Sequence, residues 1–82
     1  MAANEKLKNC LRKNLLIKRD ELNITQERMA ELLDLSRKGY QKLESGKSFC
    51  SGETLVNFVN NFDVDAQQLF SEFSKAIENS EE

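Results

Sequence analysis

The feature that most constrains the fold is a pair of short amphipathic segments within residues 23–47, joined by a polar break. In the first segment, Met29, Ala30 and Leu33 recur at helical spacing, so they fall on one face. Residues 34–36 then interrupt the periodicity with an aspartate and a serine, which favour turns and helix starts. We therefore predict two short helices with a tight turn between them.

The second segment has two chemically different faces. Tyr40 and Leu43 share the apolar face, whereas long basic and amide side chains occupy the other. These side chains are Arg37, Lys38, Gln41 and Lys42. A helix of this kind suits the major groove of DNA, with its polar side toward the bases. The alternative is an ordinary solvated helix face, because charged side chains are mostly exposed.

The length of 82 residues allows one domain with a thin core. We place this domain at residues 1–78 and expect a disordered acidic tail at residues 79–82. Association with a second copy is an expected supplement, because so small a core stabilises a fold only modestly.

Charge is distributed unevenly along the chain. The formal net charge is −2, although DNA-binding domains are usually basic. Residues 1–47 contain eleven Lys or Arg and seven Asp or Glu, a balance of +4, whereas residues 48–82 have a balance of −6. We therefore expect one basic face that can approach phosphate and one acidic face that points away from it.

Several classes of protein are disfavoured by residues that the sequence lacks. There is no histidine, the commonest general base and metal ligand, and the three glycines form no phosphate-binding loop. Cys10 and Cys50 are far apart and are expected to be free, partly buried thiols. We predict no enzymatic activity, no metal, no other cofactor and no small-molecule ligand.

No apolar run approaches the roughly 20 residues that a membrane span needs, so we expect no membrane association. The N-terminal residues also lack the apolar core of a signal peptide, and we therefore expect a cytoplasmic protein.

Capping residues predict five helices and an all-α fold. We expect the first helix at residues 4–22, and Asp34 and Gly46 are expected in left-handed backbone conformation after the second and third helices. The expected N-caps of the second to fifth helices are Thr25, Ser36, Ser51 and Asp65.

Apolar residues in the first and last helices leave two packing questions open. The stripe of the first helix includes Leu7, Leu11, Leu15 and Leu22. Leu16 and Ile17 fall outside this stripe, so they contact the last helix or a second copy, or they are partly exposed. The last helix carries Phe70, Phe73 and Ile77, which we expect to form a homodimer interface. The alternative is packing on the first helix of their own chain.

An ordered series of residues resembles the lambda-repressor-like helix-turn-helix family, the Xre/Cro type of phage and bacterial regulators. The resemblance covers about residues 15–70. It is carried by Ile24-Thr25-Gln26-Glu27, Met29-Ala30, Leu33, Leu35-Ser36, Leu43-Glu44, Gly46-Lys47, Thr54-Leu55, Asp63-Val64 and Leu69-Phe70. It implies a compact five-helix domain with the helix-turn-helix formed by the second and third helices.

The resemblance also implies roles for individual residues. Base contacts are expected from Arg37, Lys38, Gln41 and Lys42. Phosphate contacts are expected from Gln26, Ser36, Tyr40 and Lys47, helped by backbone amides near Lys47. Arg19 and Glu44 match a family pair that forms an internal ion pair.

Several residues depart from the pattern of the family. Asp34 replaces the usual glycine of the turn, and Tyr40 stands where an aliphatic residue is usual. Gly39 stands where a small hydroxyl residue is common, and we expect it to relieve a close approach to the second helix or to DNA. Cys50 and Gly52 replace proline and leucine. These changes leave the expected fold and docking intact but remove any basis for predicting the bases read.

Two functions are compatible with the sequence. The first is a sequence-specific transcriptional regulator that binds a pseudo-palindromic operator in double-stranded DNA as a homodimer. Small members of the family include phage repressors, antitoxins and restriction–modification controller proteins, and the length and acidic C-terminus resemble the last group most. The alternative is a protein-interaction module, antitoxin-like or regulator-binding, that retains the fold and holds its partner with the last helix. The acidic half of the chain and the net charge of −2 favour it.

Overall fold

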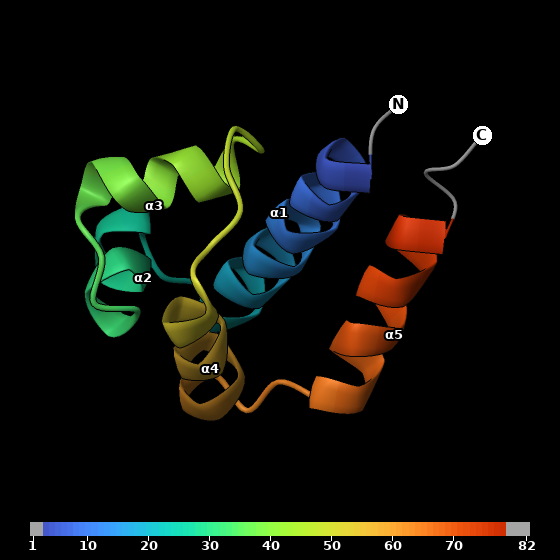
Figure 1. Ribbon diagram of the computed structural model, residues 1–82. Helices are drawn as coiled ribbons and strands as arrows, with labels where there is room; N and C mark the ends of the chain where they lie inside the picture. Colours follow the sequence, from blue (N-terminus) through green and yellow to red (C-terminus); the bar gives the residue numbers. More distant parts are fainter. Residues whose placement is uncertain (1–2, 79–82) are drawn as a thin grey trace.

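A computed structural model describes residues 3–78, and five α-helices contain most of them (Figure 1). The helices are α1 (Ala3–Leu22), α2 (Gln26–Leu32), α3 (Arg37–Glu44), α4 (Gly52–Asn61) and α5 (Ala66–Glu78). No strand occurs in this described part of the chain. The predicted all-α, five-helix fold is therefore confirmed, whereas the predicted tail at residues 79–82 lies outside the described residues.

Side-chain oxygens cap the first turns of four helices, as the sequence predicts. Each accepts a hydrogen bond from a backbone N–H three residues ahead, which has no partner within the helix. The distances are 3.1 Å for Thr25 to Arg28, 3.0 Å for Ser36 to Gly39, 3.1 Å for Ser51 to Thr54 and 3.2 Å for Asp65 to Gln68.

Residues in left-handed backbone conformation turn the chain sharply where helices end. The φ angle is +58° at Asp34 and +78° at Gly46, so the predicted left-handed conformation is confirmed at both. Asn23 and Asp63 adopt it as well, with φ of +54° and +53°. Asparagine and aspartate occupy this region more readily than other residues with a side chain. These turns let short helices fold back on one another.

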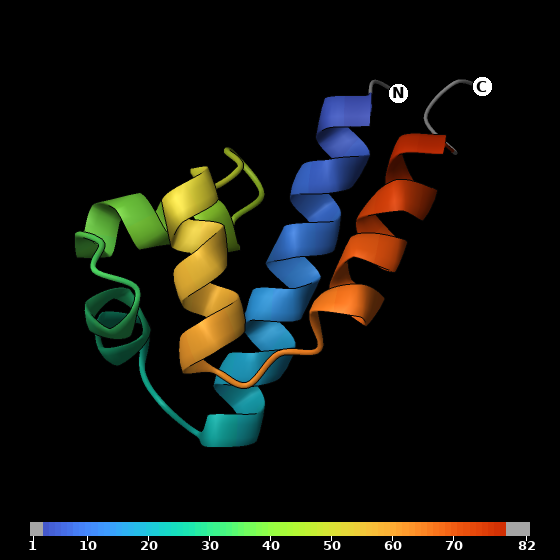
Figure 2. The same cartoon turned by 60° about the horizontal axis from the view of Figure 1, so that its bottom comes forward.

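The α1 helix lies at the centre of the molecule, with α5 against one side and α3 toward the other (Figures 1 and 2). α2 packs on α3. Side chains from all five helices form one continuous core. Its members are Leu11, Leu15, Met29, Ala30, Leu33, Tyr40, Leu43, Phe58, Phe62, Leu69 and Phe73. Because α3 contributes side chains to this core, the packing of its inner face also fixes the direction in which its outer face points.

Two expectations about individual positions are wrong: that Leu22 is buried with its stripe, and that Gly39 approaches α2. The other possibility for Gly39, a close approach to DNA, stays a prediction. Leu22 is 48% exposed, because it lies in the last turn of α1, beyond the helices that cover the rest of the stripe. A side chain at Gly39 would first meet the Ser36 hydroxyl at 3.0 Å, which is the cap of the same helix and not part of α2. Outside the stripe of α1, Leu16 is half-buried and Ile17 is exposed.

The core position of α4 predicts a large effect for one substitution. Phe58 is buried and its ring lies 5.5 Å from that of Phe62. We expect Phe58→Ala to lower the free energy of unfolding by about 3–5 kcal/mol, because it leaves a cavity. Val56→Ala is the control on the same helix, where Val56 is exposed and the loss should be below about 1 kcal/mol. Equal losses in urea-induced unfolding would contradict the packing described.

Candidate nucleic-acid interface

The outer face of α3 gathers most of the side chains predicted to contact bases. Arg37, Lys38, Gln41 and Lys42 are all exposed. A shallow surface hollow is lined by Lys38, Gln41, Lys42, Ser45 and Lys47, which we call the α3 face. The structure thus places three of the four predicted base contacts beside Lys47, which is predicted to bind phosphate.

Arg37 does not line this hollow. Its Nη1 atom lies 3.9 Å from Oε1 of Glu27 on α2, and both side chains are largely exposed. An ion pair between such groups contributes little stability, but the charge of Glu27 offsets that of Arg37. The positive charge of the α3 face therefore comes mainly from its three lysines.

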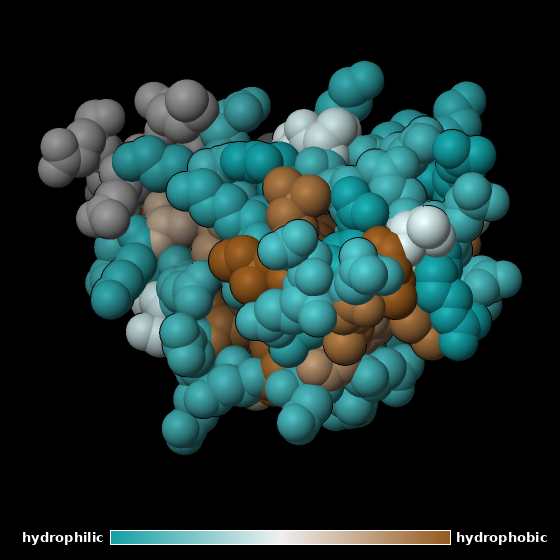
Figure 3. Space-filling view, turned by 180° about the vertical axis from the view of Figure 1, so that it is seen from behind, coloured by the Kyte–Doolittle hydropathy of each residue, from teal (hydrophilic) through white to brown (hydrophobic). Residues whose placement is uncertain are grey.

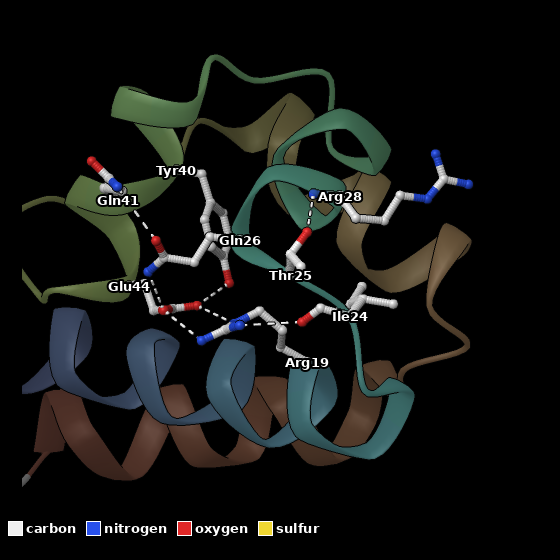
Figure 4. Close-up of polar contacts among 8 residues, drawn as sticks. All are labelled: Arg19, Ile24, Thr25, Gln26, Arg28, Tyr40, Gln41 and Glu44. Carbon is white, nitrogen blue, oxygen red and sulfur yellow. Dashed lines mark hydrogen bonds and ion pairs between the residues drawn. The ribbon is translucent and has the colours of Figure 1, made fainter.

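A buried carboxylate joins the inner side of the α2–α3 pair to α1 (Figure 4). Glu44 accepts hydrogen bonds from Arg19 Nε at 2.9 Å and Nη2 at 3.1 Å. It also accepts from Gln26 Nε2 and from the Tyr40 hydroxyl, each at 2.6 Å. Arg19 donates in addition to the carbonyl of Ile24 at 3.1 Å. The ion pair expected between Arg19 and Glu44 is present and joins α1 to α3, and the bond from Gln26 adds α2 to the same carboxylate.

Gln26 links this buried group to the α3 face. Its Nε2 atom donates to Glu44, and its Oε1 atom accepts from Gln41 Nε2 at 3.3 Å (Figure 4). The amide therefore bridges a buried carboxylate and a side chain that is predicted to read a base. One N–H of Gln26 remains for the predicted phosphate contact, as does the hydroxyl hydrogen of Ser36, whose oxygen caps α3.

The backbone amides after α3 are already occupied. The N–H groups of Lys47 and Ser48 donate to the Lys42 carbonyl at 3.0 and 3.3 Å, and that of Gly46 donates to the Leu43 carbonyl at 3.2 Å. These bonds complete the end of the helix. The N–H groups of residues 46–48 are therefore engaged within the protein, and a contribution of other backbone amides near Lys47 to a phosphate contact stays a prediction.

Residues 13–72 match the family model described as a helix-turn-helix domain. The match covers the C-terminal half of α1, the first half of α5 and all of the helices between them. The chain belongs to this family. Searches of curated proteins and of solved structures found no match. The matched region contains nearly all of the residues that carry the resemblance to lambda-repressor-like proteins.

The predicted phosphate contact of Tyr40 needs correction in this helix-turn-helix domain. Tyr40 is 0% exposed, and its hydroxyl points inward to Glu44. The ring fills the aliphatic core position, and burying the hydroxyl requires a hydrogen-bond partner, which Glu44 provides. Tyr40 therefore has a structural role in positioning α3.

The ionisation of Glu44 follows from its partners. Burial raises the pKa of Glu44, but hydrogen bonds from Tyr40, Gln26 and Arg19 and the charge of Arg19 lower it by more. The net pKa is therefore below its usual value. Burial and the hydrogen bond to Glu44 raise the pKa of Tyr40, so its hydroxyl remains a donor.

The predicted dimer interface on α5 is only partly available. Phe73 is 6% exposed and its ring packs edge-on against Phe49, with centroids 5.6 Å apart. Phe73 lies one turn after the buried Leu69, which places it on the core face of the helix. Its predicted place in a dimer interface is therefore corrected. Phe70 and Ile77 remain candidates, since about half of each is exposed. Figure 3 shows apolar side chains surfacing among polar ones on the face opposite to that in Figure 1.

The two thiols of the helix-turn-helix domain are free and half-buried. Burial raises the pKa of Cys50 to about 11, and burial and the nearby Glu72 raise that of Cys10, so both are neutral and poorly nucleophilic near pH 7. Within residues 3–78, no three His, Cys, Asp or Glu side chains are grouped to hold a metal ion. None of the helices described there is long and apolar enough to cross a membrane.

Sequence reasoning missed two of the three residues that bond to Glu44. Tyr40 precedes Glu44 by four positions on α3, and this spacing could have revealed the contact. The Gln26 contact joins two helices and has no local signal in the sequence.

Replacing Glu44 tests its contribution to stability. We expect Glu44→Gln to lower the free energy of unfolding by about 2–3 kcal/mol at pH 7, because the buried, charged acceptor of three side chains is lost. The folded-state pKa of Glu44 is lowered, so its stabilisation is complete above the unfolded value of about 4.3. It is lost as the pH falls through the lower folded-state pKa.

The difference between wild type and Glu44→Gln should therefore shrink in urea titrations below about pH 4. Glu31→Gln is the matched control, because the exposed pair of Glu31 with Arg28 should contribute less than about 1 kcal/mol. A difference between wild type and Glu44→Gln that stays constant down to pH 2 would contradict this account.

Proposed function

We propose that this helix-turn-helix domain is a sequence-specific transcriptional regulator that binds double-stranded DNA as a homodimer, with α3 in the major groove. The proposal includes no enzymatic activity and no bound cofactor. Arg37, Lys38, Gln41 and Lys42 contact bases, and Gln26, Ser36 and Lys47 contact phosphates. A symmetric dimer places two such helices about 34 Å apart and reads a pseudo-palindrome.

The observation that carries this proposal is the rigid support of the α3 face. Tyr40 and Leu43 fix the inner side of α3 in the core, and Glu44 fixes its end to α1. The exposed side then presents lysine and glutamine side chains on one surface. Lysine suits the O6 and N7 acceptors of guanine, and glutamine suits the N6 and N7 of adenine.

The small charge of the α3 face supports binding by two subunits. Three lysines, with Arg37 offset by Glu27, neutralise few phosphates, so one subunit would bind weakly, and log K would fall with log salt by only about 0.9 for each phosphate contacted. Two linked subunits add their contacts and bind far more tightly. Phe70, exposed on α5, is the centre of the surface that we propose for the dimer.

One set of observations favours a second function, a protein-interaction module. The net charge is −2, the C-terminal half is acidic and Phe70 is exposed. An exposed aromatic side chain in an acidic region suits a protein partner as well as a second copy. Binding to DNA discriminates between the two functions.

Selection of bound duplexes from random DNA at low salt tests the proposed regulator. We expect a pseudo-palindromic consensus for the wild type, and Arg37→Ala/Lys38→Ala should lose it, since each base contact contributes about 1–3 kcal/mol of discrimination. Lys18→Ala/Lys75→Ala is the control, because it removes the same charge from α1 and α5. If the wild type selects no preferred sequence, the interaction module is favoured instead.

Sedimentation at micromolar concentration tests the dimer. We expect the wild type to sediment as a dimer and Phe70→Glu to sediment as a monomer, because two carboxylates would face each other across a two-fold axis. Val56→Glu is the control, since Val56 is equally exposed but lies on α4. A monomeric wild type, or loss of the dimer in Val56→Glu alone, would contradict an interface on α5.

A further inference from the structure

The geometry points to Arg12 on α1 as a DNA phosphate contact that extends the interface beyond the helix-turn-helix pair. This inference rests on the proposed function. It identifies a residue outside the predicted set, on a helix to which the sequence assigned only a structural role. The ligand is the phosphate backbone that continues past the C-terminal end of α3.

Arg12 lies beside the end of the recognition helix. A Cβ atom at Gly46 would be 3.5 Å from Cδ of Arg12, so the arginine side chain lies across the turn that closes α3. A surface hollow here is lined by Arg12, Ser45 and Gly46 together with residues of the first turns of α1. Ser45 also lines the α3 face, so the two surfaces are continuous.

The guanidinium of Arg12 is held in place without losing its charge. Its Nε and Nη2 atoms donate to Oδ1 of Asn9 at 3.0 and 2.8 Å. Asn9 is neutral, and two bonds to one oxygen fix the plane of the group while leaving other N–H donors for a ligand. This arrangement suits an anion, because the donors are ordered before binding.

Each of the other three arginines lies close to a carboxylate. Arg19 pairs with Glu44, Arg28 pairs with Glu31, and Arg37 lies close to Glu27. Among residues 3–78, Arg12 is the one arginine with no ion pair to a carboxylate, although Glu5 lines the same hollow. Its charge is therefore the arginine charge least compensated within the molecule.

A phosphate beside the turn after α3 finds the N–H groups of residues 46–48 already bonded, and the side chain of Arg12 can bind it instead. The N–H groups of Gly46, Lys47 and Ser48 all bond within the turn after α3. A phosphate at this end of α3 then depends mainly on side chains, and Lys47 and Arg12 are cationic side chains on the two sides of the turn, with Lys6 lining the same hollow as Arg12. Arginine binds phosphate through a planar pair of donors, which lysine does not offer.

The salt dependence of DNA binding tests this role. On the duplex selected by the wild type, we expect Arg12→Gln to reduce the slope of log K against log salt by about 0.9 for each bound subunit. Affinity for unrelated duplexes should fall by the same factor, so that the ratio of specific to nonspecific binding is unchanged. Arg12→Lys keeps the charge and should retain the wild-type slope.

The control is Lys18→Gln, which removes one charge from the same helix but from the groove between α1 and α5. Its slope should equal that of the wild type. A wild-type slope in Arg12→Gln, or equal reductions in Arg12→Gln and Lys18→Gln, would overturn the contact. Absence of DNA binding by the wild type would instead refute the proposed function. Thermal unfolding of each variant establishes that the fold is retained.

Discussion

The carboxylate of Glu44 is the group on which the orientation of α3, the proposed recognition helix, depends. It lies at the end of α3 and is bonded to α1 through Arg19, to α2 through Gln26 and to its own helix through Tyr40. A buried charge is costly to desolvate and stable only when its partners are in place. The bonds therefore favour one arrangement of three helices over any in which a partner moves away. In this domain, a single titratable group couples the internal packing to the direction in which Lys38, Gln41 and Lys42 point.

The small positive charge of the α3 face limits how tightly one copy of this surface could bind a polyanion. The α3 face has three lysines, and the adjacent arginine is offset by Glu27. Binding to a polyanion then depends on adding contacts, either from a second copy or from cations elsewhere on the same copy. The acidic C-terminal half does not oppose this, because its charge belongs mainly to α4, α5 and the turn between them.

The sequence predicts the helices of this domain well because their limits are encoded locally. Thr25, Ser36, Ser51 and Asp65 each form the expected cap, and Asp34 and Gly46 each adopt the expected left-handed turn. It predicts less well the features that depend on packing between distant segments. Phe73 lies within one turn of both Leu69 and Phe70, so helical spacing alone does not show which of these faces is covered, whereas in the structure Phe73 packs on Phe49 and Phe70 is exposed. Leu22 continues the stripe of α1, but no other helix covers its position.

The candidate interface, too, is predictable only where local helical spacing determines it. The exposed residues of α3 follow from helical spacing, because that spacing separates them from Tyr40 and Leu43. The inward direction of the Tyr40 hydroxyl, the bridge formed by Gln26 and the place of Arg12 beside Gly46 all involve contacts between helices. Such contacts have no periodic signature in a single sequence.

The left-handed conformation of Asn23, Asp34 and Asp63 determines which substitutions their turns can accept. A residue with a side chain in this conformation costs about 1 kcal/mol or somewhat more, which glycine avoids. Glycine, however, enlarges the conformational freedom of the unfolded chain by a similar free energy. The two terms oppose each other, so exchange between aspartate and glycine at Asp34 is close to neutral. The fold thus requires the direction of the chain at that turn, and either residue can provide it.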